Sequence, residues 1–400
     1  DDYEGRYGLE KYYNDMLSRK EEMSFANFFV EIFSGLSSAL SDKQNDAEAH
    51  ITTTIEPTVQ KFFEEQLAKT KNKWQADGIG GVIIDPKTGE IFSMASLPDF
   101  NPSEKQTELT NLMNPLVQSS YEMGSIIKPL TVAAGLDAGV ITPETTYNDK
   151  GCITLNTKKI CNYDLKARGV IPVQEVLNQS LNLGATFVEQ KIGREKFRKY
   201  LLAYGLNEKT GIDLPGEISG DLRNFLSSSR EVESATASFG QGIALTPIET
   251  ARALCTLGNG GYLIEPHVVK KIDYLNKISR EIKPKIIRQV LTKETSAKIS
   301  KMLVTVVDTK LAGGKAKLEN YSVAAKTGTA QMSNPNGGGY YEDRYLHSFF
   351  GYFPAYNPRF LIFMYMLYPK GVKYSSETLT EPFIGTTKFL INYYQVPPDR

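Results

Sequence analysis

Three short polar motifs, met in one order along the chain, constrain its fold more than any other feature of the sequence. They are Ser125-Ile126-Ile127-Lys128, Ser180-Leu181-Asn182 and Lys326-Thr327-Gly328-Thr329. Taken singly, each has an ordinary explanation, such as a helix cap or a lysine that protects an edge strand. Taken together, they supply a serine nucleophile and lysine bases, provided that the fold brings three distant segments to one place.

The first motif predicts a helix start that carries a nucleophile. Pro129 is tolerated only in the first turn of a helix, because the N–H that it lacks would have no partner there. We therefore expect the helix to begin at or just before Ser125. Lys128 would then share a face with Ser125, whose own N–H could donate to an oxyanion. Burial beside two isoleucines, with a second cation nearby, would lower the pKa of Lys128 and let it act as a base.

The third motif is typical of a strand whose apolar start gives way to polar residues. Because side chains alternate along a strand, Thr327 and Thr329 share one face, where two hydroxyls suit a carboxylate. Lys326 can turn towards the first motif and supply its second cation. Gly328 leaves room for the close approach of another backbone or of a ligand.

The second motif lies between two stretches of helical pattern, so we expect it on a short connection between helices. A hydroxyl at Ser180 could relay a proton, and the amide of Asn182 could hydrogen-bond a substrate amide through both of its edges.

Longer segments around the motifs resemble the penicillin-binding protein family. Tyr121–Pro129 resembles its active-site segment, and Arg6–Tyr13 resembles the end of the non-catalytic pedestal of the class B, monofunctional members. Further likeness, from about residue 51 to about residue 385, lies in the first hairpin (81–96), a glycine-rich turn (239–247) and the strand after the third motif (348–355). Met123 departs from the proline that is usual in the family.

The resemblance implies an α+β fold of the penicillin-binding and serine β-lactamase type. We expect a mainly antiparallel sheet covered by helices, with an inserted all-helical lobe and the active site in the crevice between them. Strands are expected at both ends of the domain, so that distant segments would assemble one sheet. Residues 1–50 would be the end of the pedestal and a linker, and residues 51–400 the transpeptidase domain.

The implied activity is a peptidoglycan D,D-transpeptidase that cross-links stem peptides through a serine acyl-enzyme and that β-lactams trap. It needs no cofactor or metal. The catalytic residues would be Ser125, Lys128, Ser180 and Lys326, and the substrate-binding residues Asn182, Thr327, Gly328 and Thr329. The expected partners are a wall-synthesis polymerase and proteins of division or elongation, with the septal type favoured over the lateral one.

Charge and hydropathy limit the other possibilities. The balance of 46 basic and 46 acidic residues gives no support for a nucleic-acid partner. The three histidines have no spacing typical of a metal site or a Ser-His-Asp triad. No apolar run is long enough to span a bilayer, so we expect a membrane anchor upstream of residue 1 and a location on the outer face of the bacterial plasma membrane.

Several alternatives share these features. A D,D-carboxypeptidase, a β-lactamase or a β-lactam sensor would keep the same catalytic residues, although no Glu-x-x-Leu-Asn segment of a class A β-lactamase lies between the second and third motifs. A catalytically silent scaffold of a wall-synthesis complex would be a different class. Stable acylation, turnover of a penicillin, or no acylation separates them.

Two further features of the sequence each allow two interpretations. Cys152 and Cys161 flank a predicted hairpin, where they would form a disulfide or stay reduced, whereas Cys255 should be a buried thiol. The Phe-rich segment 23–40 has the spacing of an amphipathic helix, which would pack within the chain or lie at a membrane interface.

Overall fold

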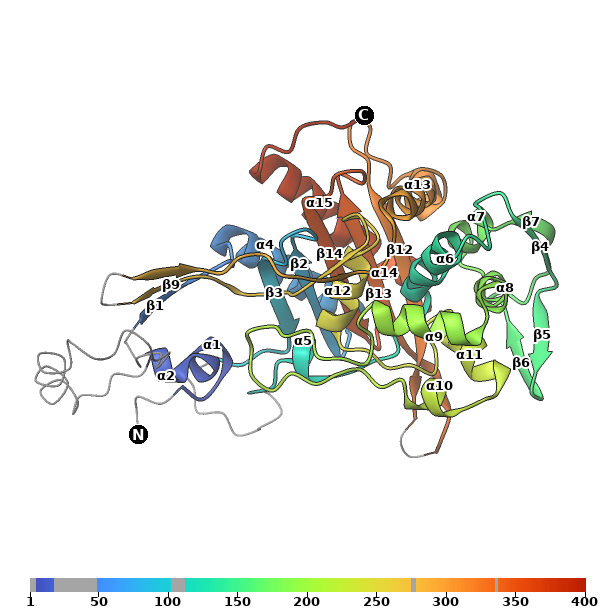
Figure 1. Cartoon of the computed structure of the whole chain (residues 1–400), viewed down its shortest axis with the longest axis horizontal. Coiled ribbons are helices and arrows are strands. Elements are labelled where there is room, and N and C mark those ends of the chain that lie inside the picture. The colour runs from blue at the N-terminus through green and yellow to red at the C-terminus, as the bar shows by residue number, and fades with distance from the viewer. Residues whose placement is uncertain (1–4, 18–48, 102–111, 275–277, 335–336) are drawn as a thin grey trace, which may run out of the picture.

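The computed structural model describes residues 5–17, 49–101, 112–274, 278–334 and 337–400. A five-stranded antiparallel sheet forms its centre (Figure 1). In spatial order its strands are β12 (Ala324–Ser333), β13 (Tyr340–Phe353), β14 (Phe360–Leu367), β2 (Gly78–Ile84) and β3 (Ile91–Leu97). The two ends of the domain thus build one sheet, as predicted, and the predicted hairpin at 81–96 forms β2 and β3.

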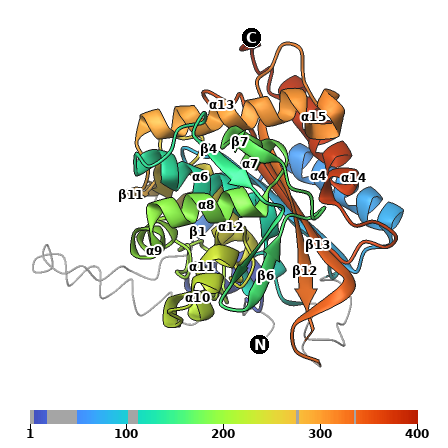
Figure 2. The same ribbon diagram turned by 90° about the vertical axis from the view of Figure 1, so that its right-hand side faces the viewer.

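Successive side chains of a strand point to opposite faces of a sheet, and here both faces are buried in a core. Phe349 packs with Phe63 and Phe383 under α4 (Pro57–Trp74) and α15 (Thr380–Tyr393). Phe350, the next residue, belongs to the second core, which lies towards the helical lobe. The sheet is therefore the middle layer between two sets of helices (Figure 2).

The lobe between β3 and the later strands is mainly helical. Its helices are α5 (Pro115–Gln118), η2 (Gly124–Ile127), α6 (Lys128–Asp137), α7 (Gln174–Asn178), α8 (Asn182–Ile192), α9 (Arg194–Ala203), α10 (Arg223–Ser227), α11 (Glu231–Ala237) and α12 (Pro247–Cys255). Beyond this lobe follow α13 (Lys293–Thr309), η3 (Leu311–Gly314) and α14 (Ser375–Thr378).

The expectation of an all-helical lobe needs correction. Four short strands interrupt it: β4 (Thr146–Asp149) pairs with β7 (Gly169–Pro172), and β5 (Cys152–Leu155) pairs with β6 (Lys158–Cys161). The β5–β6 hairpin closes through Asn156 and Thr157, both of which have positive φ (45° and 69°), a conformation that suits a tight hairpin turn. Cys152 and Cys161 face each other across it and form a disulfide, and Cys255 is a buried free thiol.

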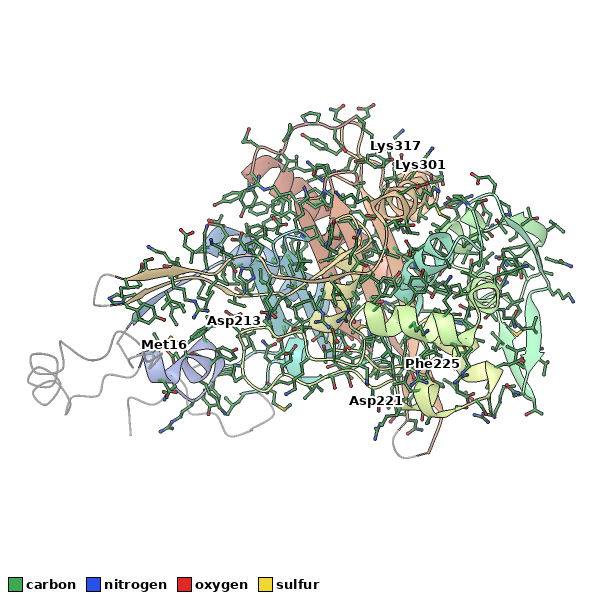
Figure 3. The ribbon with its side chains drawn as sticks, in the orientation of Figure 1. Met16, Asp213, Asp221, Phe225, Lys301 and Lys317 are labelled. Carbon is green, nitrogen blue, oxygen red and sulfur yellow. A yellow bond between two sulfur atoms is a disulfide. The ribbon has the colours of Figure 1, made fainter. Side chains whose placement is uncertain are left out.

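The N-terminal helices pack against a smaller sheet beside the central one. The sheet consists of β1 (Ala49–Thr53), β9 (Val269–Tyr274) and β10 (Ser279–Glu281), and a separate pair joins β8 (Tyr262–Ile264) to β11 (Ile286–Gln289). Helices α1 (Gly8–Tyr12) and α2 (Asn14–Leu17) reach this sheet through Tyr13, whose hydroxyl donates to Asp213 at 3.1 Å. Figure 3 labels Asp213 near Met16, at the end of the molecule that carries these helices.

Asp213 hydrogen-bonds both to Tyr13 of the N-terminal segment and to the backbone at the start of β9. Besides the tyrosine hydroxyl, its carboxylate accepts hydrogen bonds from the N–H groups of Val268 and Val269 at 2.7 and 2.8 Å.

The Phe-rich segment 23–40 lies outside the described residues. No helix of the described ranges has both the length and the apolar character that crossing a membrane requires.

Candidate active site

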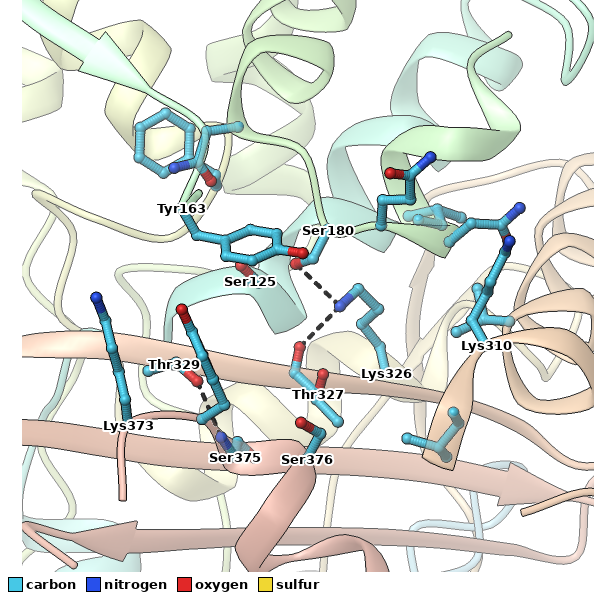
Figure 4. A pocket seen from close by; sticks show the side chains of 18 of the residues that line it. Ser125, Tyr163, Ser180, Lys310, Lys326, Thr327, Thr329, Lys373, Ser375 and Ser376 are labelled. Atoms are coloured by element: carbon cyan, nitrogen blue, oxygen red, sulfur yellow. Dashed lines mark hydrogen bonds between the residues drawn. The ribbon is translucent and has the colours of Figure 1, made fainter. Parts of the chain in front are cut away.

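All three motifs line one cavity of about 780 Å³ (Figure 4). Ser125 reaches it from η2, Ser180 and Asn182 from the junction of α7 and α8, and Thr327 and Thr329 from β12. The sheet and the lobe therefore meet at this cavity, which lies in the crevice that the sequence predicted.

Ser125 lies in a 3₁₀ turn and not inside the α-helix. The turn η2 spans Gly124–Ile127, and α6 begins only at Lys128, with Pro129 in its first turn. The prediction from Pro129 was therefore right about the first turn, but it placed the α-helix about one turn too early. The N–H of Lys128 donates to the carbonyl of Ser125, which keeps the two residues stacked one turn apart.

Two glycines let this turn sit directly against β12. A Cβ on Gly328 would lie 2.8 Å from the carbonyl oxygen of Met123, and one on Gly124 would lie 2.7 Å from the carbonyl oxygen of Thr329. Gly124 also has a φ of +64°, which side chains rarely adopt. The hydroxyl of Ser348 donates to the same Met123 carbonyl at 2.7 Å. Backbone contact with two strands thus sets the position of Ser125.

Lys128 is fully buried beneath the cavity and makes three polar contacts. Its Nζ lies 2.9 Å from Ser125 Oγ, 2.6 Å from the carbonyl oxygen of Ser180 and 3.3 Å from Ser180 Oγ. Burial, and then the charge of Lys326, hold the pKa of Lys128 well below its usual range. A neutral amine has two N–H donors and one lone pair, so it can donate to both Ser180 oxygens while accepting the proton of Ser125.

Lys326 approaches the same hydroxyl from the sheet. Its Nζ donates to Ser180 Oγ at 3.1 Å and to the carbonyl of Thr327 at 2.9 Å (Figure 4). Burial lowers the pKa of Lys326 to about 7. Both lysines therefore contact Ser180 Oγ, which sits on a residue with φ of 56°. Two buried cations this close repel each other, which favours one neutral amine over two charged ones.

The second motif forms the junction that the sequence predicted, because α7 ends at Asn178 and α8 begins at Asn182. The side-chain amide of Asn182 donates to the carbonyl of Cys161 at 2.9 Å. Cys161 is the disulfide-bonded residue at the end of β6, and it lines the cavity. The hairpin thus fixes the orientation of Asn182.

Side chains of β12 alternate as predicted. Thr327, Thr329 and Gln331 are half-buried and line the cavity, whereas Gly328 is buried against η2. The hydroxyl of Thr329 accepts a hydrogen bond from the N–H of Ser375 at 3.1 Å (Figure 4). This contact leaves the hydroxyl proton of Thr329 available to a ligand.

The 373–378 segment, which no motif predicts, lines one side of the cavity through Lys373, Tyr374, Ser375, Ser376 and Glu377. His347 hydrogen-bonds to both ends of this segment. Its Nε2–H donates to the carbonyl of Lys373 at 3.0 Å, and because the neutral ring then carries no proton on Nδ1, this nitrogen accepts from the hydroxyl of Thr378 at 2.9 Å. The ring of Tyr374 meets that of Tyr163 from the lobe, with centroids 5.7 Å apart. The spacing of His347 to other histidines, cysteines or serines carries no signal for such a role, because a histidine that positions a loop does so through contacts with residues distant in the sequence.

No group of three metal-ligating side chains suitable for an ion occurs within the described ranges.

Comparison with known proteins identifies relatives. The sequence model for the penicillin binding protein transpeptidase domain matches residues 79–386. Stage V sporulation protein D of Bacillus subtilis is 33% identical over 394 residues, which cover 96% of this chain and 60% of that protein.

Two further relatives agree with these matches. The peptidoglycan D,D-transpeptidase FtsI of Buchnera aphidicola is 28% identical over 405 residues, which cover 100% of this chain and 67% of that protein. The crystal structure of penicillin binding protein 3 from Mycobacterium tuberculosis, complexed with ampicillin, has a TM-score of 0.81 at 27% identity and covers 90% of this chain and 82% of that one. The chain spans less than two thirds of the length of its Bacillus relative.

Proposed function

The chain belongs to the penicillin-binding protein transpeptidase family, and on that premise we propose that it is a class B peptidoglycan D,D-transpeptidase acylated at Ser125. The observation that carries the proposal is the convergence of all three motifs: Lys128 contacts both Ser125 and Ser180, and Lys326 contacts Ser180. A proton can therefore pass between these groups without leaving the site.

Acylation begins with attack of Ser125 Oγ on the carbonyl between the two terminal D-alanines. Neutral Lys128 takes the hydroxyl proton, and a C–O bond forms. When the C–N bond breaks, Ser180 and Lys326 deliver a proton to the departing D-alanine amine, so that charge is conserved in the step. The low pKa of Lys128 suits this role, because a lysine at its usual pKa would be protonated at neutral pH.

The remaining motif residues bind the donor and the oxyanion. Thr327 and Thr329 line the cavity with hydroxyls for the donor carboxylate, and Asn182 lines the same cavity and would bind the donor amide. The N–H groups of Ser125 and Thr329 hold the oxyanion, a contribution of about 3 kcal/mol per donor. Gly328 acts by leaving space, because any side chain there would push the turn of Ser125 away from the strand.

An amine from a neighbouring stem peptide then resolves the acyl-enzyme and forms the cross-link. We propose a division-type enzyme, in line with the transpeptidase named FtsI among its relatives, working with a wall-synthesis polymerase. Cell-wall synthesis enzymes act outside the cytoplasm, and we propose a membrane anchor upstream of residue 1. Residues 1–50 would be the end of a pedestal, and 51–400 the transpeptidase domain.

Labelling with a fluorescent penicillin tests the proposal. The whole chain should form one stable adduct, mapped by mass spectrometry to Ser125, and Ser125→Ala should form none. Ser376→Ala removes an exposed serine from the rim of the same cavity and should label as the wild type does. Rapid release of hydrolysed penicillin would instead indicate a β-lactamase, and labelling of Ser125→Ala would exclude this nucleophile.

A further inference from the structure

The charged residues that line the described cavity are mostly basic: Lys310, Lys326 and Lys373, against the single carboxylate of Glu377. Lys326 belongs to the catalytic group. Lys310 and Lys373 are exposed and lie at opposite ends of the cavity (Figure 4). A substrate with one terminal carboxylate does not use all of this charge, so the outer lysines are available for a further contact with a ligand.

The direction in which the donor peptide binds along the cavity decides whether it contacts Lys310 or Lys373. In the proposed reaction the terminal carboxylate lies at the Lys326 end of β12, and the scissile carbonyl lies at Ser125, whose turn packs against Thr329. The acyl part of the donor therefore runs on along β12 towards Gln331, at about 3.4 Å per residue. Lys310 lies at the other end, beyond the leaving group.

Lys373 lies close to the end of β12 towards which the acyl part of the donor extends. Gln331 pairs with Tyr345 across the sheet, and the Nζ of Lys373 lies 5.8 Å from the centroid of the Tyr345 ring and 5.7 Å from that of Tyr374. The bond from His347 fixes the backbone of Lys373. No ion pair within the described ranges involves Lys373, so its charge is available to a ligand.

We propose that Lys373 is a specificity-determining residue that selects acyl donors with a second carboxylate, carried on the side chain of the acyl part near the scissile bond. The inference rests on the proposed function of the same cavity. A stem peptide whose side chain ends in a free carboxylate would fit better than one in which that group is amidated or is replaced by an amine.

Two penicillins provide a matched test, because carbenicillin differs from benzylpenicillin only by a carboxylate on its side chain. The quantity to measure is the ratio of the second-order acylation rate constants of the two compounds. We expect Lys373→Gln to lower the carbenicillin-to-benzylpenicillin ratio about threefold to tenfold, and Lys373→Glu to lower it further. The effect should shrink as salt is raised, because the lysine is exposed.

Lys310→Gln is the control, since it removes the same charge from the opposite end of the cavity. It should leave the ratio unchanged. An unchanged ratio in Lys373→Gln overturns the inference, and so does an equal fall in Lys310→Gln, because the net charge of the cavity would then explain the preference. Acylation by benzylpenicillin reports separately on the proposed function.

A binding measurement tests Lys373 even without acylation. Calorimetry with Ser125→Ala compares two donor peptides that differ only in a free or an amidated side-chain carboxylate. The free acid should bind about threefold to tenfold more tightly, and adding Lys373→Gln should remove the difference. Equal affinity of both peptides for Ser125→Ala overturns the inference.

Discussion

The hydroxyl of Ser348, on the second strand of the sheet, donates at 2.7 Å to the carbonyl of Met123, two residues before the proposed nucleophile Ser125. The hydroxyl is buried, and the place that it occupies lies where a side chain on Gly328 would be. The position of Ser125 thus depends on β13 as well as on its own helical turn. This dependence can be tested by substitution.

We expect Ser348→Ala to slow acylation by penicillin about tenfold or more. The change removes the buried hydrogen bond that Ser348 donates to the carbonyl of Met123, at a cost of about 0.5–1.5 kcal/mol, and it loosens the contact that holds the turn of Ser125 against β13. Stopped-flow measurement of acylation and thermal unfolding would be compared. Ser300→Ala is the control, because Ser300 is equally buried and contacts Tyr352 away from the cavity. Equal effects on acylation in both variants would refute the link.

The pH dependence of acylation should report the charge of Lys326. That charge helps to hold the pKa of Lys128 below its usual range. Its removal in Lys326→Ala makes protonation of Lys128 easier, so the pKa of Lys128 rises. In the pH profile of the acylation rate, the acidic limb should therefore move to higher pH, and the maximum rate should also fall. Lys310→Ala, which removes an exposed lysine, should leave the limb in place. A limb that moves to lower pH in Lys326→Ala would contradict this account.

How far the sequence could predict this site depended on the range of the interactions. Pro129 and the alternation of Thr327 and Thr329 are local signals, so the helix turn and the cavity-facing hydroxyls were predicted from them. The 373–378 segment could not be found in this way. Its position depends on hydrogen bonds of His347 to residues 26 and 31 positions away, and no local pattern encodes such contacts.

The same limit explains the two structural corrections. The 3₁₀ turn at Ser125 results from packing of Gly124 against a distant strand, which a helix rule based on one proline does not include. In the lobe, the strands β4 and β7 are separated by the β5–β6 hairpin and contain only four residues each. Segments that short have too few residues to show the alternation that marks a strand.

His347 should make the fold sensitive to acid. Burial lowers its pKa to about 4, against 6.5 for an exposed histidine. Between these values the unfolded chain binds a proton that the folded chain does not, so stability is lost as the pH falls through this window. The full effect is about 3 kcal/mol, at 1.4 kcal/mol per pH unit.

Urea unfolding of the wild type and of His347→Asn at pH 7 and pH 4 would measure this contribution. We expect His347→Asn to be less stable at pH 7, because it loses its bonds to the 373–378 segment, but to lose about 3 kcal/mol less than the wild type on acidification. His50→Asn changes an exposed histidine and should lose as much as the wild type. Equal acid sensitivity in His347→Asn would show that the ring is not buried in its neutral form.

The disulfide should stabilise the lobe and support substrate binding. It closes the β5–β6 hairpin, and the carbonyl of Cys161 orients the amide of Asn182. We expect the double variant Cys152→Ala/Cys161→Ala to lose about 2–3 kcal/mol of unfolding free energy, the usual value for a loop of this length. Acylation should also slow, because the freed carbonyl no longer holds Asn182 towards the donor.

Thiol counting on the unreduced protein checks the bond itself. After unfolding without reductant, only Cys255 should react with an alkylating reagent, and Cys255→Ala should leave no reactive thiol. Dithiothreitol should slow acylation of Cys255→Ala, which retains the disulfide, but should not affect the double variant, which has none. Three reactive thiols in the unreduced wild type would exclude the disulfide. Slowing of the double variant by dithiothreitol would show that the reductant acts elsewhere.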